Sequence, residues 1–188
     1  TVKRAGLLSN ITASGSPAMT PAFNTATKSY TVVIPATQSS VVITPVKTSA
    51  ARTVKINGVT ASSVTLRPAV GGSATATIAV TATNGIKDTY TVVVKRVAPL
   101  SGITLSTGTL SPVFNPATTA YSVNLASGTA LTITPAATSG SSFTIDGNTV
   151  PSIVLSEPVG GGPVVVTIVA KASNGVTSIP YQVTVNWS

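Results

Sequence analysis

Apolar and polar residues alternate one by one through several stretches of this chain. In the first half the pattern is clearest at 30–34, 77–82 and 90–94, where apolar residues recur at every second position. Side chains of a β-strand point alternately to its two faces, so the pattern predicts strands with one buried face. Turn residues such as Asn57-Gly58 separate the segments. Shorter strands are expected at 8–13, 40–46, 52–57 and 61–67.

The second half of the chain repeats the first. Leu8-Ser9-Asn10-Ile11 returns as Leu100-Ser101-Gly102-Ile103, and the opening Val2–Ala5 matches Val94–Val97, the end of the first copy. We therefore expect a piece of a longer tandem array. The chain itself is expected to have three parts. Residues 1–5 are the end of a preceding repeat or an N-terminal extension, and they are followed by a first domain at 6–97 and a second domain at 98–188. The strands expected in the second domain are 100–106, 119–125, 129–135, 141–149, 152–156, 163–172 and 178–187.

Composition agrees with strands, because the apolar residues are mostly Val, Ile and Ala and the gaps are filled by Thr and Ser. β-branched side chains suit a pleated sheet and lose rotamer freedom in a helix. No apolar run is long enough to cross a bilayer, so we expect no membrane span in this segment. Aromatic residues recur at matching positions and are expected to anchor the cores as the pairs Phe23/Phe114, Tyr30/Tyr121 and Tyr90/Tyr181.

A family resemblance rests on several of these repeated runs. Leu100–Ser106, followed by Leu110–Phe114 and then Tyr121–Val123, resembles the bacterial cadherin-like β-sandwich domain. Asn84-Gly85-Ile86 and then Tyr90–Arg96 match the family's C-terminal pattern. The resemblance covers both copies. With the strand pattern it predicts an all-β chain of two tandem seven-stranded antiparallel immunoglobulin/cadherin-like β-sandwiches. It implies extracellular, multi-domain bacterial proteins and no catalytic residues.

Charge is divided unevenly between the two copies. Before residue 98 the chain has ten Lys or Arg against Asp88 alone, or +9, whereas the second copy has one Lys against two acidic residues, or −1. A uniformly basic chain would suggest nucleic acid, which we do not expect here. The first domain is instead a candidate binder of an acidic polymer. The candidate contact residues are Lys28, Lys47, Arg52, Lys55, Arg67 and Lys87.

The residues needed for most chemistry are scarce. The chain has no Cys and no His, and its only acidic residues are Asp88, Asp146 and Glu157. We therefore expect no catalytic residue, no cofactor-binding residue and no metal site, calcium at the domain junction included. Asp146-Gly147 occupies the place of Asn57-Gly58 and is expected to form a hairpin turn rather than to act as a catalytic acid. The protein is not expected to be an enzyme.

Two differences between the copies suggest a contact surface. Thr75 and Ala79, on the outward face of a strand, become Val165 and Val169, and Arg96 at the end of the last strand becomes Trp187. One interpretation is drift, with Trp187 closing the end of the sandwich. The other is that Val165, Val169 and Trp187 contact another subunit or domain.

The function expected is that of a structural module in an extracellular bacterial surface protein, as a spacer, a stalk or a filament-forming segment. The alternative is a binding module whose basic first domain captures an anionic polysaccharide or another acidic cell-surface polymer. The expected partners are neighbouring repeats or identical subunits, and in the alternative an acidic polysaccharide. The expected location is secreted or on the cell surface.

Overall fold

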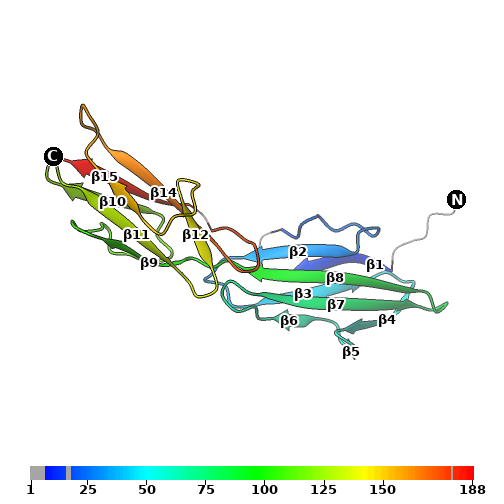
Figure 1. Cartoon of the computed structure of the whole chain (residues 1–188). Coiled ribbons are helices and arrows are strands. Elements are labelled where there is room, and N and C mark those ends of the chain that lie inside the picture. The colour runs from blue at the N-terminus through cyan, green and yellow to red at the C-terminus, as the bar shows by residue number, and fades with distance from the viewer. Residues whose placement is uncertain (1–6, 16–17, 179) are drawn as a thin grey trace. The chain divides into compact units, whose positions relative to one another are not determined.

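The computed structural model describes residues 7–15, 18–178 and 180–188, and every regular element in these ranges is a β-strand (Figure 1). The all-β prediction is confirmed. The chain divides into two compact units between Arg96 and Val97, and each unit has its own hydrophobic core. Residues 1–5, the expected end of a preceding repeat, lie outside the described residues. Within the described ranges, no helix long and apolar enough to cross a membrane is found.

The first unit is built from two sheets. One has three strands in the order β1-β3-β6, and the other has five in the order β2-β8-β7-β4-β5. The strands are β1 (Leu8–Ala13), β2 (Ser29–Ile34), β3 (Val41–Lys47), β4 (Ala51–Ile56), β5 (Val59–Thr60), β6 (Val64–Leu66), β7 (Ser73–Ala82) and β8 (Lys87–Arg96).

The second unit repeats this plan. Its sheets have the orders β13-β11-β9 and β10-β15-β14-β12. The strands are β9 (Leu100–Leu105), β10 (Ala120–Leu125), β11 (Leu131–Ala137), β12 (Ser142–Ile145), β13 (Ile153–Leu155), β14 (Val164–Lys171) and β15 (Tyr181–Trp187).

The predicted antiparallel arrangement is wrong for one strand pair in each unit. β2 runs parallel to β8, with Tyr30 opposite Val92, and β10 runs parallel to β15. All other named strand pairs in the described residues are antiparallel. Alternation shows which face of a strand is buried, and it looks the same whichever way the neighbouring strand runs. No hairpin joins β2 to β8, so no short turn forces the two strands to be antiparallel.

The first unit also has one strand more than expected. β5 is only two residues long, both exposed, and it pairs with the end of β4 across the Asn57-Gly58 turn. Val59–Thr60 is too short to show an alternation. The pairing exists because the tight turn folds the chain back onto β4.

Alternating residues of the strands fill the core of each unit. Tyr30, Ile78, Val80, Tyr90 and Val92 are all buried as predicted, and so are their second-copy partners Tyr121, Ile168, Ala170, Tyr181 and Val183. The other predicted pair, Phe23 and Phe114, is only partly buried at the margin of each core. Both residues lie on loops rather than on strands, and their rings stack on the tyrosine that follows, with centroids 5.8 Å and 5.9 Å apart.

A tyrosine hydroxyl fastens the same loop in both units. The Tyr30 hydroxyl accepts a hydrogen bond from the Asn24 N–H and lies 2.6 Å from the Asn24 carbonyl oxygen, to which it donates. Tyr121 makes the equivalent pair of bonds with Asn115, at 3.1 Å and 2.7 Å. A buried hydroxyl needs such partners, because an unpaired polar group is costly away from water. We call this arrangement the tyrosine clamp.

The predicted hairpin role of Asn57 and Asp146 is confirmed. Both residues have positive φ, 52° and 47°, and each is followed by a glycine that also has positive φ. That backbone is the two-residue turn favoured between antiparallel strands, and Asn and Asp tolerate it better than other side chains. The two side-chain oxygens accept hydrogen bonds from the N–H groups of Thr77 and Thr167, at 2.8 Å and 2.7 Å.

Candidate functional site

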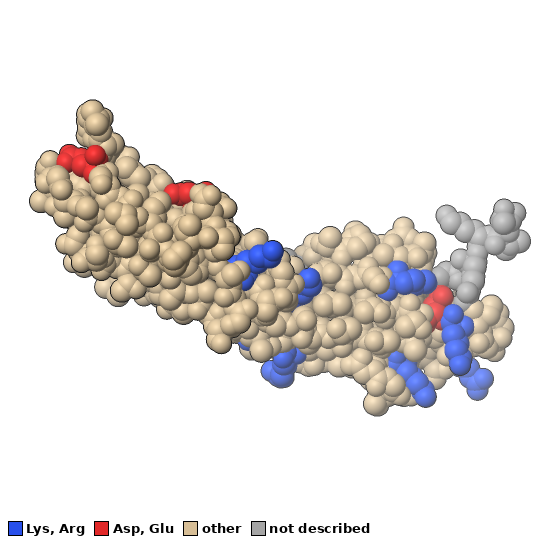
Figure 2. Space-filling model, in the orientation of Figure 1, with Lys and Arg blue, Asp and Glu red and all other residues tan. Residues whose placement is uncertain are grey.

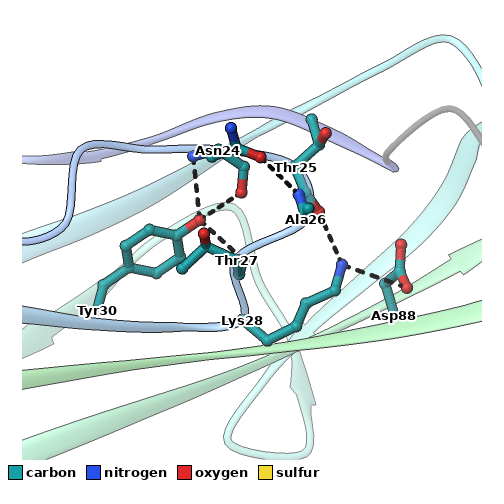
Figure 3. Close-up of polar contacts among 7 residues, drawn as sticks. All are labelled: Asn24, Thr25, Ala26, Thr27, Lys28, Tyr30 and Asp88. Carbon is teal, nitrogen blue, oxygen red and sulfur yellow. Dashed lines mark hydrogen bonds and ion pairs between the residues drawn. The ribbon is translucent and has the colours of Figure 1, made fainter.

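Lys28, the first of the six candidate polyanion contacts, is already engaged within the first unit. Its ammonium nitrogen lies 3.4 Å from Asp88 Oδ1 and donates a hydrogen bond of 3.0 Å to the Thr25 carbonyl (Figure 3). The same nitrogen sits 4.1 Å from the centre of the Tyr90 ring. Exposure is 41% for the Lys28 side chain and 13% for that of Asp88. A cation held by a carboxylate, a carbonyl and an aromatic face has little left to offer an external anion.

The second unit arranges this position differently. Thr119 stands where Lys28 stands, and the Tyr181 hydroxyl donates to the Pro116 carbonyl at 2.9 Å and accepts from the Leu100 N–H. Burial raises the pKa of Tyr181, which keeps its phenol protonated and able to donate. The equivalent Tyr90 hydroxyl is buried, and no described residue is hydrogen-bonded to it. In the first unit the Thr25 carbonyl, which corresponds to that of Pro116, accepts its hydrogen bond from Lys28 instead of from the tyrosine.

Two further candidates, Lys47 and Arg52, line one groove of about 590 Å³ in the first unit. The end of β3, the start of β4 and the segment after β5 enclose it. The side chains of Lys47 and Arg52 are exposed and make no hydrogen bond or ion pair with any described residue. The other lining residues are Pro45, Val46, Thr53, Val54, Thr60, Ala61 and Ser62.

The groove exists because the two sheets are incompletely covered on this side. β6 pairs with β3 only from Val41 to Ile43, and β5 pairs with β4 only at Lys55 and Ile56. The last part of β3 and the first part of β4 therefore have no named strand beside them on this side. Pro45 suits such an edge, because it has no N–H to leave unpaired.

Arg52 occupies a β-bulge. Ala51 pairs with Ala82 and Thr53 with Thr81, so Arg52 is an extra residue between two adjacent pairs. The equivalent pairing of β12 with β14 runs without a register shift. A bulge re-aims the side chain that it carries. Arg52 therefore lines the groove at an irregularity that the second copy lacks.

The remaining basic candidates do not join this groove. Lys55 is exposed on β4 opposite Ala79, Arg67 follows β6, and Lys87 begins β8 opposite Thr81. Lys and Arg side chains on the face drawn in Figure 2 lie in separate groups with other residues between them. Of the six candidates, the groove unites Lys47 and Arg52.

The three apolar candidates of the second unit do not lie on one surface. Val165 is 50% exposed and Val169 partly buried on the outer face of β14. Trp187 continues the inward series of Tyr181, Val183 and Val185, and it packs against the core. Its indole N–H donates to the Thr129 carbonyl at 2.8 Å. Val165 and Trp187 therefore face opposite sides of the same sheet.

Trp187 and its counterpart Arg96 hold equivalent positions by different chemistry. The Arg96 guanidinium donates to the carbonyls of Ala36 and Pro68. The indole of Trp187 instead combines apolar packing with one hydrogen bond to Thr129. Each side chain ties the end of the last strand to neighbouring loops of its own unit.

Glu157 is the remaining acidic residue. Its carboxylate accepts hydrogen bonds of 2.7 Å from the Ser127 hydroxyl and the Gly128 N–H. The bond from Ser127, followed by that from Gly128, lowers the pKa of Glu157. The contact fastens the loop before β14 to the turn after β10. Among the described residues, no group of three or more His, Cys, Asp or Glu is placed to hold a metal ion.

Three solved structures illustrate the similarities of the chain. It matches the Clostridium thermocellum CbhA fibronectin(III)-like modules with 14% identity and a TM-score of 0.35, over 94% of both chains. It matches Drosophila OTK extracellular domains 3–5 with 8% identity and a TM-score of 0.38, over 86% of this chain and 60% of that one. Protocadherin gamma B2 extracellular cadherin domains 3–6 match with 11% identity and a TM-score of 0.32, over 87% and 46%.

No curated protein is significantly similar to the chain in sequence. The sequence model of the cadherin-like beta sandwich domain family matches residues 8–97. This range begins at the first residue of β1 and ends one residue after β8. The first of the two units, with its Leu-Ser-Asn-Ile opening and its tyrosine clamp, therefore belongs to the cadherin-like beta sandwich domain family.

Proposed function

We propose that this chain is a non-enzymatic structural segment of an extracellular bacterial surface protein, working as a spacer or stalk within a tandem array. The observation that carries the proposal is what the two units share. Both keep the tyrosine clamp, the stacked phenylalanine and the hairpin turn with positive φ. These features stabilise a fold, whereas the charged surface residues differ. Domains of this family are usually extracellular and typically non-catalytic.

The spacer role is tested in the parent surface protein by exchange. One variant lacks both units, and the matched variant carries an unrelated pair of fibronectin type III domains in their place. A spacer requires length and stability only, so we expect deletion to impair the parent's function and the exchange to restore it. If the exchange fails as completely as the deletion, the two units have a specific role and the spacer proposal is wrong.

The structural role can include filament formation, in which copies of the chain associate through the outer face of β14. Val165 and Val169 project from this face, where the first unit has Thr75 and Ala79. Burying two valines contributes roughly 3 kcal/mol, which favours association without being sufficient for it. If the chain self-associates, Val165→Asp with Val169→Asp should reduce its sedimentation coefficient at high concentration. If the unsubstituted chain is monomeric at that concentration, or if the double variant associates as strongly as it does, the filament proposal is wrong.

We infer a second candidate function, capture of an acidic cell-surface polymer by the first unit. The supporting observation is the charge division, with the side chains of Lys47 and Arg52 exposed and without an internal partner among the described residues. Binding of a polyanion releases its counterions, so affinity should fall steeply with salt. We expect heparin, used as a probe, to perturb backbone amides of the first unit and not those of the second. Equal perturbation of both units, or binding that is insensitive to salt, contradicts this function.

A further inference from the structure

We propose that the groove between β3 and β4 of the first unit binds an acidic polysaccharide through its carboxylate groups, with Arg52 and Lys47 as the two anion contacts. This inference deepens the polyanion function inferred above and rests on it. It adds a defined site, a ligand class and a prediction of which cations matter.

The groove has the size and the lining of a small-ligand site. Its volume of about 590 Å³ falls within the range common for ligand pockets. Pro45 and Val54 are buried and provide an apolar floor, whereas Lys47 and Arg52 are exposed. Thr53, Thr60 and Ser62 add hydroxyl groups, which both donate and accept hydrogen bonds.

Comparison of the two copies shows that the fold does not need these features. Strand pairing places Ala137 of β11 where Lys47 stands and Phe143 of β12 where Val54 stands. Phe143 packs against the core of the second unit. The second unit therefore builds the same sandwich with a larger side chain at the floor and without the cation at the end of β11. The bulge that carries Arg52 is likewise absent from β12.

The lining distinguishes among classes of acidic ligand. A peptide strand would pair along β3, but Pro45 has no N–H to donate and interrupts the ladder. Single-stranded nucleic acid uses aromatic side chains for base stacking, and no aromatic residue is among those lining the groove. A carboxylate sugar needs a cation and several hydroxyl partners instead. The planar guanidinium of Arg52 matches a carboxylate in bidentate geometry, and Lys47 supplies a second charge.

The experiment uses a galacturonic acid tetrasaccharide as the probe and the full chain labelled with nitrogen-15. We expect amide shifts at Thr53, Thr60 and Ser62. Arg52→Gln should weaken binding about tenfold or more, because a charge-assisted hydrogen bond is lost. Lys47→Gln should weaken it to a smaller extent. Lys171→Gln is the matched control, since it removes the same net charge from an exposed position at the end of β14 in the second unit and should leave binding unchanged.

Several outcomes overturn the inference. No binding at millimolar concentration, or equal weakening by Lys171→Gln and Arg52→Gln, removes the groove as a site. Equally tight binding of a neutral tetrasaccharide or of hexaglutamate shows that the ligand class is wrong. Unchanged amide spectra outside the groove show that the Arg52 and Lys47 variants remain folded. If heparin still binds the first unit with its salt dependence while the groove variants have no effect, this inference fails and the broader polyanion function stands.

Discussion

Replacing the tyrosine of β8 by phenylalanine should not destabilise the protein, whereas the same replacement of its equivalent in β15 should. The Tyr90 hydroxyl is buried without a hydrogen-bond partner among the described residues, whereas the Tyr181 hydroxyl donates to the Pro116 carbonyl and accepts from the Leu100 N–H. The rings are otherwise comparable. Each is buried. The Tyr90 ring lies near Phe23 and the Tyr181 ring near Phe114, with centroids 6.3 Å and 6.5 Å apart.

The size of each stability change depends on whether the hydroxyl group that is removed has hydrogen-bond partners. Burying a hydroxyl without a partner costs about 1–3 kcal/mol, so Tyr90→Phe should leave the first unit equally stable or stabilise it by up to about that amount. Lys28 keeps its place over the ring, because phenylalanine also offers a negative face to a cation. Tyr181→Phe removes two hydrogen bonds, each with a net contribution of about 1 kcal/mol. The second unit should therefore lose about 1–3 kcal/mol, which lowers its Tm by several degrees.

The two units can be followed separately in the intact chain. Trp187 is the only tryptophan, so its fluorescence during urea unfolding reports the second unit. Hydrogen exchange measured on peptides from β8 and from β15 reports each unit in the same sample. Tyr90→Phe should leave the tryptophan transition unchanged. If Tyr90→Phe destabilises the first unit as much as Tyr181→Phe destabilises the second, the Tyr90 hydroxyl has a partner and the reasoning is refuted.

Three smaller perturbations test other contacts. Lys28→Met should lower the free energy of unfolding of the first unit by about 1 kcal/mol or less, because the ion pair is partly exposed. Chemical denaturation should show no such loss for Lys55→Met. Equal losses for the two variants would show that the contacts of Lys28 do not stabilise the unit. Asn57→Ala and Asp146→Ala should each lower the free energy of unfolding by about 1–2 kcal/mol, since alanine is strained at positive φ and its side chain accepts no hydrogen bond. Glycine at either position should cost less. A higher Tm for the alanine variant than for the glycine variant would contradict this prediction. The folded pKa of Glu157 is lowered, so its contribution to the second unit is present above the unfolded pKa and disappears as the pH falls through the folded pKa. Tryptophan-monitored unfolding between pH 2 and 6, values chosen to bracket the carboxylate range, should therefore show a smaller pH dependence for Glu157→Gln.

Local patterns were sufficient for much of the fold. Alternation located the strands because the burial of each side chain follows from its own position along a pleated strand. The Asn57-Gly58 and Asp146-Gly147 hairpins were predictable because turn geometry depends on a few adjacent residues. The repeat itself indicated which aromatic residues belong to the core, since both copies keep them at matching positions. Phe23 and Phe114 were the exceptions, because a loop residue has no alternation to show how deeply it is buried.

Contacts between segments distant in sequence were decided only by the tertiary structure. The parallel pairing of β2 with β8 leaves no trace in either strand, because the alternation of each is independent of its neighbour's direction. Lys28 looks like any surface cation in the sequence, yet the fold brings Asp88 and the Tyr90 ring to it. Arg52 reaches the groove because β4 gains one residue relative to β7, and a bulge appears only when two strands are paired. A sequence lists the charges of a chain, whereas the three-dimensional pairing of its strands determines which of them remain available to a ligand.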